Sequence, residues 1–383
     1  MQILYILATV AAFVYENKMF QLYMSCLSRC DLFMDKFISV LDDYAASVIV
    51  KKRIVIDLKV TSLDIIESEG SHILGFAKPS QLIYLNANVG SYLFPKSLAK
   101  QFVEINDTSS DIYVEMIDMK GRWTFEGGNK DFKLVFAHEI AHGLGFISSV
   151  VTNGGISPDL SFEGVPSQEQ SIVFSQPTIF DHFISCGDYQ LSDFVHDYDV
   201  CATFSTAVNR DALKSVALRY IDKYTQKKLY SYLSTQAACR FKSPLSSFYV
   251  YTADDVTSLN NNLISHSVIV NDSNPIPLMN AETISTKYNG IQSVIPVLSS
   301  MGYSTTINPI PAIANVKRIE IKCKRLINVD EAKTELPEVK KNQVRWILTS
   351  VLYLASMSFI QLLPHVLYRR YFINIFDKLD FIK

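Results

Sequence analysis

The sequence predicts a layered fold of helices and strands, of the α+β class. Helical periodicity over residues 32–49 is followed at once by a strand-like run at 54–60. Two more strand candidates, 82–85 and 111–117, precede a second helix that Asp131 can cap. Alternation of helix, strand and turn residues is typical of domains in which helices cover a sheet.

Each element has its own local signal. Apolar residues recur at helical spacing across the first helix: Phe37, Val40, Leu41, Tyr44 and Val48. The segment 111–117 alternates apolar and polar residues, which favours a strand. Residues 151–177 are rich in Gly, Ser, Pro and Gln, which predicts loops. Three later segments are also assigned: helices at 207–233 and 291–301, and a strand at 247–251.

Both ends of the 383-residue chain carry apolar runs. The run at 3–14 has the length of a signal-peptide core, although no Lys or Arg precedes it. Its alternative is a first strand or helix of the core. Residues 346–367 contain no Asp, Glu, Lys or Arg and are long enough to cross a bilayer as one helix. The alternative is an interfacial or protein-packed helix.

These signals divide the chain into six predicted parts: a signal peptide at 1–20, an N-terminal subdomain at 32–150, a C-terminal subdomain at 151–304, a charged linker at 305–345, a transmembrane helix at 346–367 and a tail at 368–383. The expected location is extracellular or lumenal, with the protein anchored in the membrane by its C-terminal helix. If residues 346–367 do not span, the expected product is secreted.

Charge and cysteines limit the partners and the compartment. The net charge is −2, so nothing favours a nucleic-acid partner. The six cysteines fit disulfides outside the cell and buried thiols equally well. Cys186 and Cys201 bracket one loop-like segment and form the first pair to test. As thiolates near the start of the chain, Cys26 and Cys30 could mask a metal ion.

The most informative stretch is His138-Glu139-x-x-His142. Its two histidines lie four residues apart, on one face of a helix, where two neutral imidazoles can bind one zinc ion. Glu139 can reach a zinc-bound water and act as its base. Gly143 and Gly145 are suited to ending the helix. The alternative is a pair of histidines on an ordinary amphipathic helix.

A catalytic zinc needs a third protein ligand. In compact metzincins that ligand is a histidine three residues after the glycine that corresponds to Gly145, but this chain has Ser148 there. His266 has the best context, because Met279 follows shortly after it in a proline-rich turn. His196 is the fallback, with Asp197 beside it as a group that could orient it. His182, in the apolar stretch 177–184, is expected to be a packed core histidine.

His266, Met279 and the helix motif together resemble leishmanolysin-type metzincins, in which a long insertion separates the helix from its third histidine. The chain is also similar to uncharacterised secreted proteins of bacteria and fungi with an H-E-I-x-H-G-L-G-F motif. The resemblance covers roughly residues 32–303 and is strongest at 134–149. It implies a zincin fold: a twisted mixed sheet over an active-site helix, with a C-terminal subdomain that carries a methionine turn.

The function that this resemblance implies is a zinc endopeptidase acting on a protein or peptide. His138, His142 and His266 would hold the ion, Glu139 would be the general base, and Met279 would lie beneath the histidines. The alternative is a membrane-tethered, non-catalytic binding or adhesion module that keeps the fold. Ser148, and the Ser267-Val268 pair after His266, favour that alternative. A zinc hydrolase acting on a non-peptide bond has no supporting feature.

Overall fold

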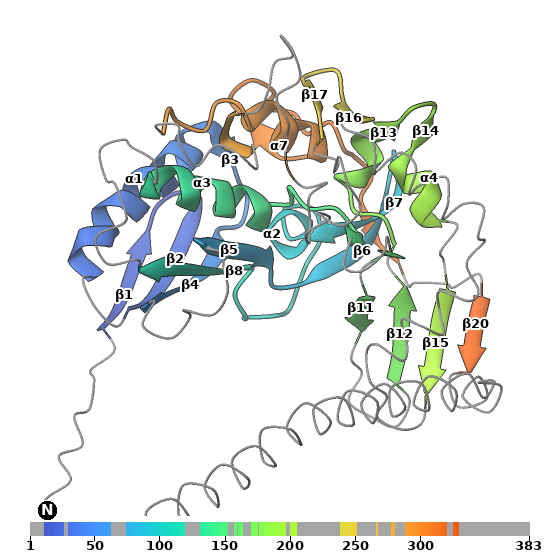
Figure 1. Cartoon of the computed structure of the whole chain (residues 1–383), viewed down its shortest axis with the longest axis horizontal. Coiled ribbons are helices and arrows are strands. Elements are labelled where there is room, and N and C mark those ends of the chain that lie inside the picture. Colours follow the sequence, from blue (N-terminus) through green and yellow to red (C-terminus); the bar gives the residue numbers. More distant parts are fainter. Residues whose placement is uncertain are drawn as a thin grey trace, which may run out of the picture. The chain divides into compact units, whose positions relative to one another are not determined.

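The computed structural model of the chain describes the following residues: 11–26, 30–62, 74–118, 131–151, 157–158, 160–163, 170–174, 176–196, 200–204, 238–250, 266, 277–279, 288–319 and 325–328. They form a mixed α and β structure with several sheets (Figure 1). The chain divides into two compact units, Met1–Ile327 and Asn328–Lys383. This division falls inside the predicted linker at 305–345.

The main sheet has five described strands in the order β1-β2-β4-β8-β5. Their bounds are Ala11–Glu16 for β1, Phe20–Cys26 for β2, Ile54–Ser62 for β4, Gly75–Pro79 for β5 and Ile112–Asp118 for β8. Strands β2, β4 and β8 run parallel, whereas β1 and β5 pair antiparallel at the two edges. Every second residue of β2 and β4 is buried, as a sheet covered on one face requires.

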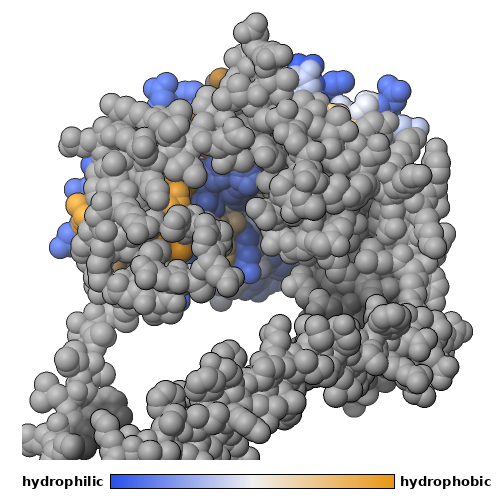
Figure 2. Space-filling view, in the orientation of Figure 1, coloured by the Kyte–Doolittle hydropathy of each residue, from blue (hydrophilic) through white to orange (hydrophobic). Residues whose placement is uncertain are grey.

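Two helices cover that face: α1 (Cys30–Ser47) and α3 (Phe132–Gly143) (Figure 1). Their contact is aromatic, since the Phe37 ring lies 4.5 Å from the ring of Phe136 and 5.0 Å from that of Phe132, centroid to centroid. The Tyr44 hydroxyl, fully buried, donates to the Ala137 carbonyl at 2.8 Å. Figure 2 shows hydrophilic residues in the central hollow of this face, with hydrophobic ones beside them. Most of the apolar side chains of these strands and helices are buried in the core.

The remaining elements near this core are short. Strand β6 (Leu82–Ala87) pairs with β7 (Gly90–Pro95) and with β19 (Lys317–Arg318). Helix α2 (Lys96–Ala99) follows β7 directly. Strand β3 (Val48–Ile49) pairs with β18 (Ser304–Thr305), which joins the end of α1 to the segment after α7 (Ile295–Met301).

The part after α3 contains three further groups of strands. One sheet has the order β14-β13-β16-β17, with bounds Tyr189–Gln190, Ile184–Cys186, Cys239–Lys242 and Ser247–Tyr249. A second has the order β11-β12-β15-β20, with bounds Leu160–Glu163, Gln170–Phe174, Val200–Phe204 and Arg325–Asn328. The pair β9 (Val150–Val151) and β10 (Ser157–Pro158) completes the set. The short helices described in this part are η2 (Asp181–Phe183), α4 (Leu191–His196) and η5 (Pro277–Met279).

Several sequence predictions are confirmed. The predicted helix at 32–49 is α1, and the strands at 54–60, 82–85 and 111–117 are β4, β6 and β8. The predicted strand at 247–251 is β17, over 247–249. The helix at 291–301 is shorter than predicted, because α7 begins at Ile295, but it ends before Gly302, whose φ is 115°. The predicted helix at 207–233 lies outside the described residues.

The prediction of loops over 151–177 was wrong in part, because β10, β11 and β12 lie there. The disulfide prediction was also wrong. Cys186 pairs with Cys239, not with Cys201, because β13 and β16 place Cys186 and Cys239 directly opposite each other. Cys26 is bonded to Cys30, so neither is a thiolate that could mask a metal ion.

The two apolar ends differ in what the structure describes. Residues 11–16, within the predicted signal peptide, form the edge strand β1, an arrangement that matches the alternative of a first core strand. The predicted membrane span at 346–367 lies outside the described residues. Among those that are described, no helix is both long and apolar enough to cross a bilayer.

Candidate metal centre

The N-cap of helix α3, Asp131, accepts hydrogen bonds on both of its carboxylate oxygens. Asp131 Oδ1 accepts from the backbone N–H groups of Lys133, at 2.9 Å, and Leu134, at 3.3 Å, which confirms the predicted N-cap. Its Oδ2 accepts from the Tyr288 N–H at 2.9 Å. One buried side chain therefore fixes the start of α3 and joins it to a distant segment.

The other end of α3 is equally constrained. The helix ends at Gly143, and Gly145 adopts a φ of +119°, which side-chain-bearing residues rarely adopt. A Cβ on Gly145 would lie 2.8 Å from Cγ of Pro95. The Tyr303 hydroxyl, fully buried, donates to the Leu144 carbonyl at 3.0 Å. These contacts set the direction of the chain as it leaves the helix.

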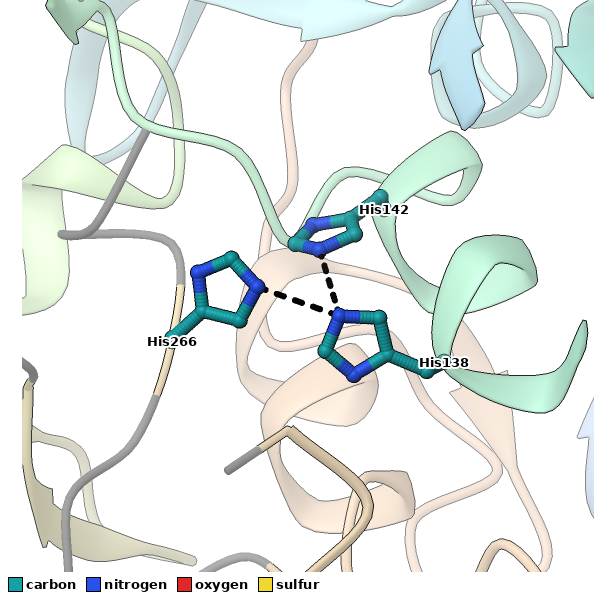
Figure 3. Close-up of side chains that lie close together, drawn as sticks. All are labelled: His138, His142 and His266. Atoms are coloured by element: carbon teal, nitrogen blue, oxygen red, sulfur yellow. Dashed lines mark hydrogen bonds between the residues drawn. The ribbon is translucent and has the colours of Figure 1, made fainter. Parts of the chain in front are cut away.

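Three imidazoles meet beside this helix (Figure 3). His138 and His142 project from successive turns of α3, and His266 comes from a separate segment. His138 Nε2 lies 3.0 Å from Nε2 of His142 and 3.1 Å from Nε2 of His266. Their ligand atoms all lie within 4.8 Å of one another. The structure thus brings together the three residues that the sequence selected.

The opposite ring nitrogens of the helical pair show which atoms carry protons. His138 Nδ1 lies 2.7 Å from the Leu278 carbonyl, and His142 Nδ1 lies 2.7 Å from the Phe146 carbonyl. A carbonyl can only accept, so each Nδ1 must donate its proton. In the neutral ring the Nε2 atom then carries a lone pair. Two lone pairs 3.0 Å apart repel, and a cation between them removes the repulsion.

Electrostatics keep the helical pair neutral. Burial lowers the pKa of His138, although its bond to Leu278 opposes the shift. The pKa of His142 is well below its ordinary value because of burial and because His138 and His266 lie close. Neutral imidazole is the form that binds metals. For a tetrahedral zinc with bonds of about 2.0–2.1 Å, two ligand nitrogens lie about 3.3 Å apart, close to the spacings here.

Glu139 follows the first histidine and is itself buried, at 8% exposure. Burial raises the pKa of Glu139 to about 8, and a hydrogen bond from the backbone of Ala77, in β5, opposes the rise. A cation within a few ångströms would favour the ionised carboxylate. A metal ion bound that close by the histidines would therefore lower the pKa of Glu139.

Ser148 is explained by a partner that the sequence did not reveal. Its hydroxyl donates to Asp181 Oδ1 at 2.6 Å, and Asp181 is fully buried. The sequence does contain a usable signal of this cluster. Asp181 lies inside the apolar stretch 177–184, and a buried carboxylate needs hydrogen-bond donors such as Ser148 and Ser149.

The other candidates lie elsewhere. His182 Nδ1 is 2.8 Å from the Tyr92 hydroxyl, and burial lowers the pKa of His182, as expected for a packed histidine. His196, the fallback ligand, is the last residue of α4, and its side chain lies outside the described part of the structure. So does Asp197, the next residue along the chain. Met279 is fully buried in η5, next to the residue whose carbonyl holds His138.

No protein-family model, curated protein or solved structure matches the chain. The resemblance to metzincins therefore rests on the motif and its context alone. What the structure adds is the geometry of the three histidines, the burial of Glu139 and the contacts that hold them.

Proposed function

We propose that the chain is a zinc-dependent endopeptidase with a zincin fold, in which His138, His142 and His266 hold one zinc ion. The observation that carries the proposal is the convergence of three Nε2 atoms while the two helical rings donate from Nδ1 to carbonyls. A hydrogen-bonded Nδ1 is what orients a histidine that binds metal through Nε2. When bound, zinc would acidify a water and polarise the scissile carbonyl.

Glu139 is the proposed general base. Its carboxylate takes a proton from the attacking water and passes it to the leaving amine. The burial of Glu139 excludes bulk water and makes the carboxyl group sensitive to a nearby cation. Ala77 holds this carboxyl group from the side of β5 through its backbone N–H.

A peptide substrate is favoured by the position of β5. Among the described strands, β5 is the last in the sheet order and pairs only with β8. Its outer edge lies on the side of α3, where Ala77 donates to Glu139. An extended peptide that paired with this edge would pass alongside the base, and adding a strand is a common way of binding peptides.

The alternative of a non-catalytic binding module drew support from Ser148. That serine has a structural explanation, because its hydroxyl donates to a buried carboxylate, Asp181. Its presence is therefore no argument in itself for an inactive site.

The proposed location is extracellular or lumenal. Two disulfides, Cys26–Cys30 and Cys186–Cys239, support an oxidising compartment. Membrane anchoring remains a proposal based on residues 346–367, and the product is secreted if they do not span.

The test uses the full chain, produced with its disulfides, and measures zinc content together with cleavage of an unfolded protein such as casein. Glu139→Gln should keep the zinc and lower the cleavage rate by about 10²–10⁴-fold. The matched control is Glu115→Gln, since Glu115 accepts from Thr61 and Tyr113 on β4 and β8 and should not affect the rate. Undiminished cleavage by Glu139→Gln would refute the base, and a wild-type chain without zinc would refute the metal centre.

A further inference from the structure

Asp181 is a buried carboxylate with an unusual number of donors. It is 0% exposed, and its Oδ1 accepts from the Ser148 hydroxyl at 2.6 Å. Its Oδ2 accepts from the N–H and hydroxyl of Ser149, at 3.0 and 2.6 Å, and from the N–H and hydroxyl of Thr178, at 2.9 and 3.0 Å. Placing a carboxylate away from water is strongly unfavourable unless donors surround it, and here both oxygens are satisfied.

The donors come from two segments that are separate in the sequence. Ser148 and Ser149 belong to the chain that leaves α3, whereas Thr178 and Asp181 precede the sheet that contains β13. The Thr178 hydroxyl also lies 2.8 Å from the Ile147 carbonyl, which shares the hydroxyl's single proton with Asp181, so the same side chain contacts both segments. Asp181 is therefore the junction at which the segment after α3 is held in place.

That segment carries the carbonyl that orients a metal ligand. The Phe146 carbonyl accepts from His142 Nδ1 at 2.7 Å, and Phe146 is followed directly by Ile147, Ser148 and Ser149. The Phe146 ring also packs against Phe180, with ring centroids 4.6 Å apart. Phe146 is thus fixed from two sides. On one side is the backbone of 147–149, whose two serines donate to Asp181. On the other is the ring of Phe180, the residue directly before Asp181.

We propose that Asp181 is a positioning residue of the metal centre, which acts on His142 through the Phe146 carbonyl. This rests on the proposed function, because it assigns a role toward the zinc ion that the three histidines would hold. Loss of the carboxylate frees residues 147–149, and the Phe146 carbonyl then no longer fixes the ring of His142. Groups that orient a metal ligand typically change metal affinity by about 10–100-fold when they are removed.

The test compares zinc affinity with stability. Asp181→Ala and the milder Thr178→Val, which removes one hydroxyl, are compared with Asp111→Ala in the full chain. Asp111 is a matched control, since it is 1% exposed and accepts from Val55 N–H and Lys100 at the start of β8. Zinc dissociation constants come from competition with a chromophoric chelator, and unfolding midpoints come from urea titration of the metal-free proteins.

Asp181→Ala should weaken zinc binding about tenfold or more, and Thr178→Val should weaken it less but in the same direction. Asp111→Ala should lower the unfolding midpoint and leave the zinc dissociation constant unchanged. Unchanged affinity in Asp181→Ala, or equal weakening in all three variants, would overturn the proposal. If Asp181→Ala does not fold, Thr178→Val decides by the same criterion. A wild-type chain that binds no zinc would overturn the metal centre itself, and this role with it.

Discussion

Two regions of the molecule orient the helical histidines, and they do so over very different distances along the chain. The carbonyl that holds His142 belongs to Phe146, four residues later, in the turn that ends α3. The carbonyl that holds His138 belongs to Leu278, 140 residues later, in η5. One contact therefore depends on how the helix ends, and the other depends on how a remote segment docks. Changes to one region should leave the other intact, which makes the two separable by mutation.

The largest effect is expected in the local region. Gly145→Ala places a Cβ 2.8 Å from Pro95 at a φ of +119°, so strain and overpacking both act. The expected loss of unfolding free energy is about 4 kcal/mol in urea titration. Gly290→Ala is the matched control, because Gly290 also has a positive φ, of +80°, but has nothing within 4 Å of the added Cβ. It should lose about 1 kcal/mol, and equal losses in the two variants would contradict the steric argument.

A somewhat smaller effect is expected in the remote region. Met279→Ala leaves a cavity at a fully buried position and should lower the unfolding free energy by about 3 kcal/mol. Because Met279 adjoins Leu278, the variant should also weaken zinc binding. Met279→Leu, which nearly conserves volume, should lose less than about 1.5 kcal/mol and keep the zinc affinity. Full zinc affinity in Met279→Ala would show that the remote carbonyl does not depend on this packing.

The smallest effect is expected in the pH dependence of stability, where the two histidines of α3 should differ. Both have a lowered pKa in the folded protein, His142 more so than His138. The unfolded chain therefore binds protons more readily below about pH 6.5, so metal-free stability falls as the pH drops from there towards the folded-state pKa. His142→Gln should remove more of this loss than His138→Gln, because the pKa of His142 is lowered further. Stability measured from pH 7.5 to 5 checks this, and identical profiles for the two variants would contradict it.

The local region was also the part that could be predicted from the sequence. The periodicity of α1, the cap at Asp131 and the stop at Gly143 are all set by neighbouring residues. By contrast, the composition of the apolar run that contains β1 fits a signal peptide and a first core strand equally well, so the sequence does not decide between them. The strands within 151–177 are too short for a period to mark them, and β12 also pairs with β15, which lies outside that segment.

The residues of the metal site also divide into those that the sequence predicts from local spacing and those that it does not. The spacing of His138 and His142 selects a metal-binding face of a helix with no further information. His266 was selected only through its proximity to Met279 and a resemblance, since nothing in its own neighbourhood specifies a ligand. Asp181 was not recognised, because its donors Ser148 and Ser149 lie 33 and 32 residues away and the need to satisfy it arises only on burial.

The double role of Asp131 also bears on how the protein is made. Its second partner, Tyr288, follows it by 157 residues, and His266 follows His138 by 128. At about 5–20 residues per second, a ribosome needs roughly 8–30 s to add the residues between Asp131 and Tyr288. During that interval α3 can form with its first two histidines, but the proposed ligand set and the anchor at the start of the helix are incomplete. The order of synthesis alone would thus keep the proposed zinc site incomplete until nearly the whole of this unit has left the ribosome.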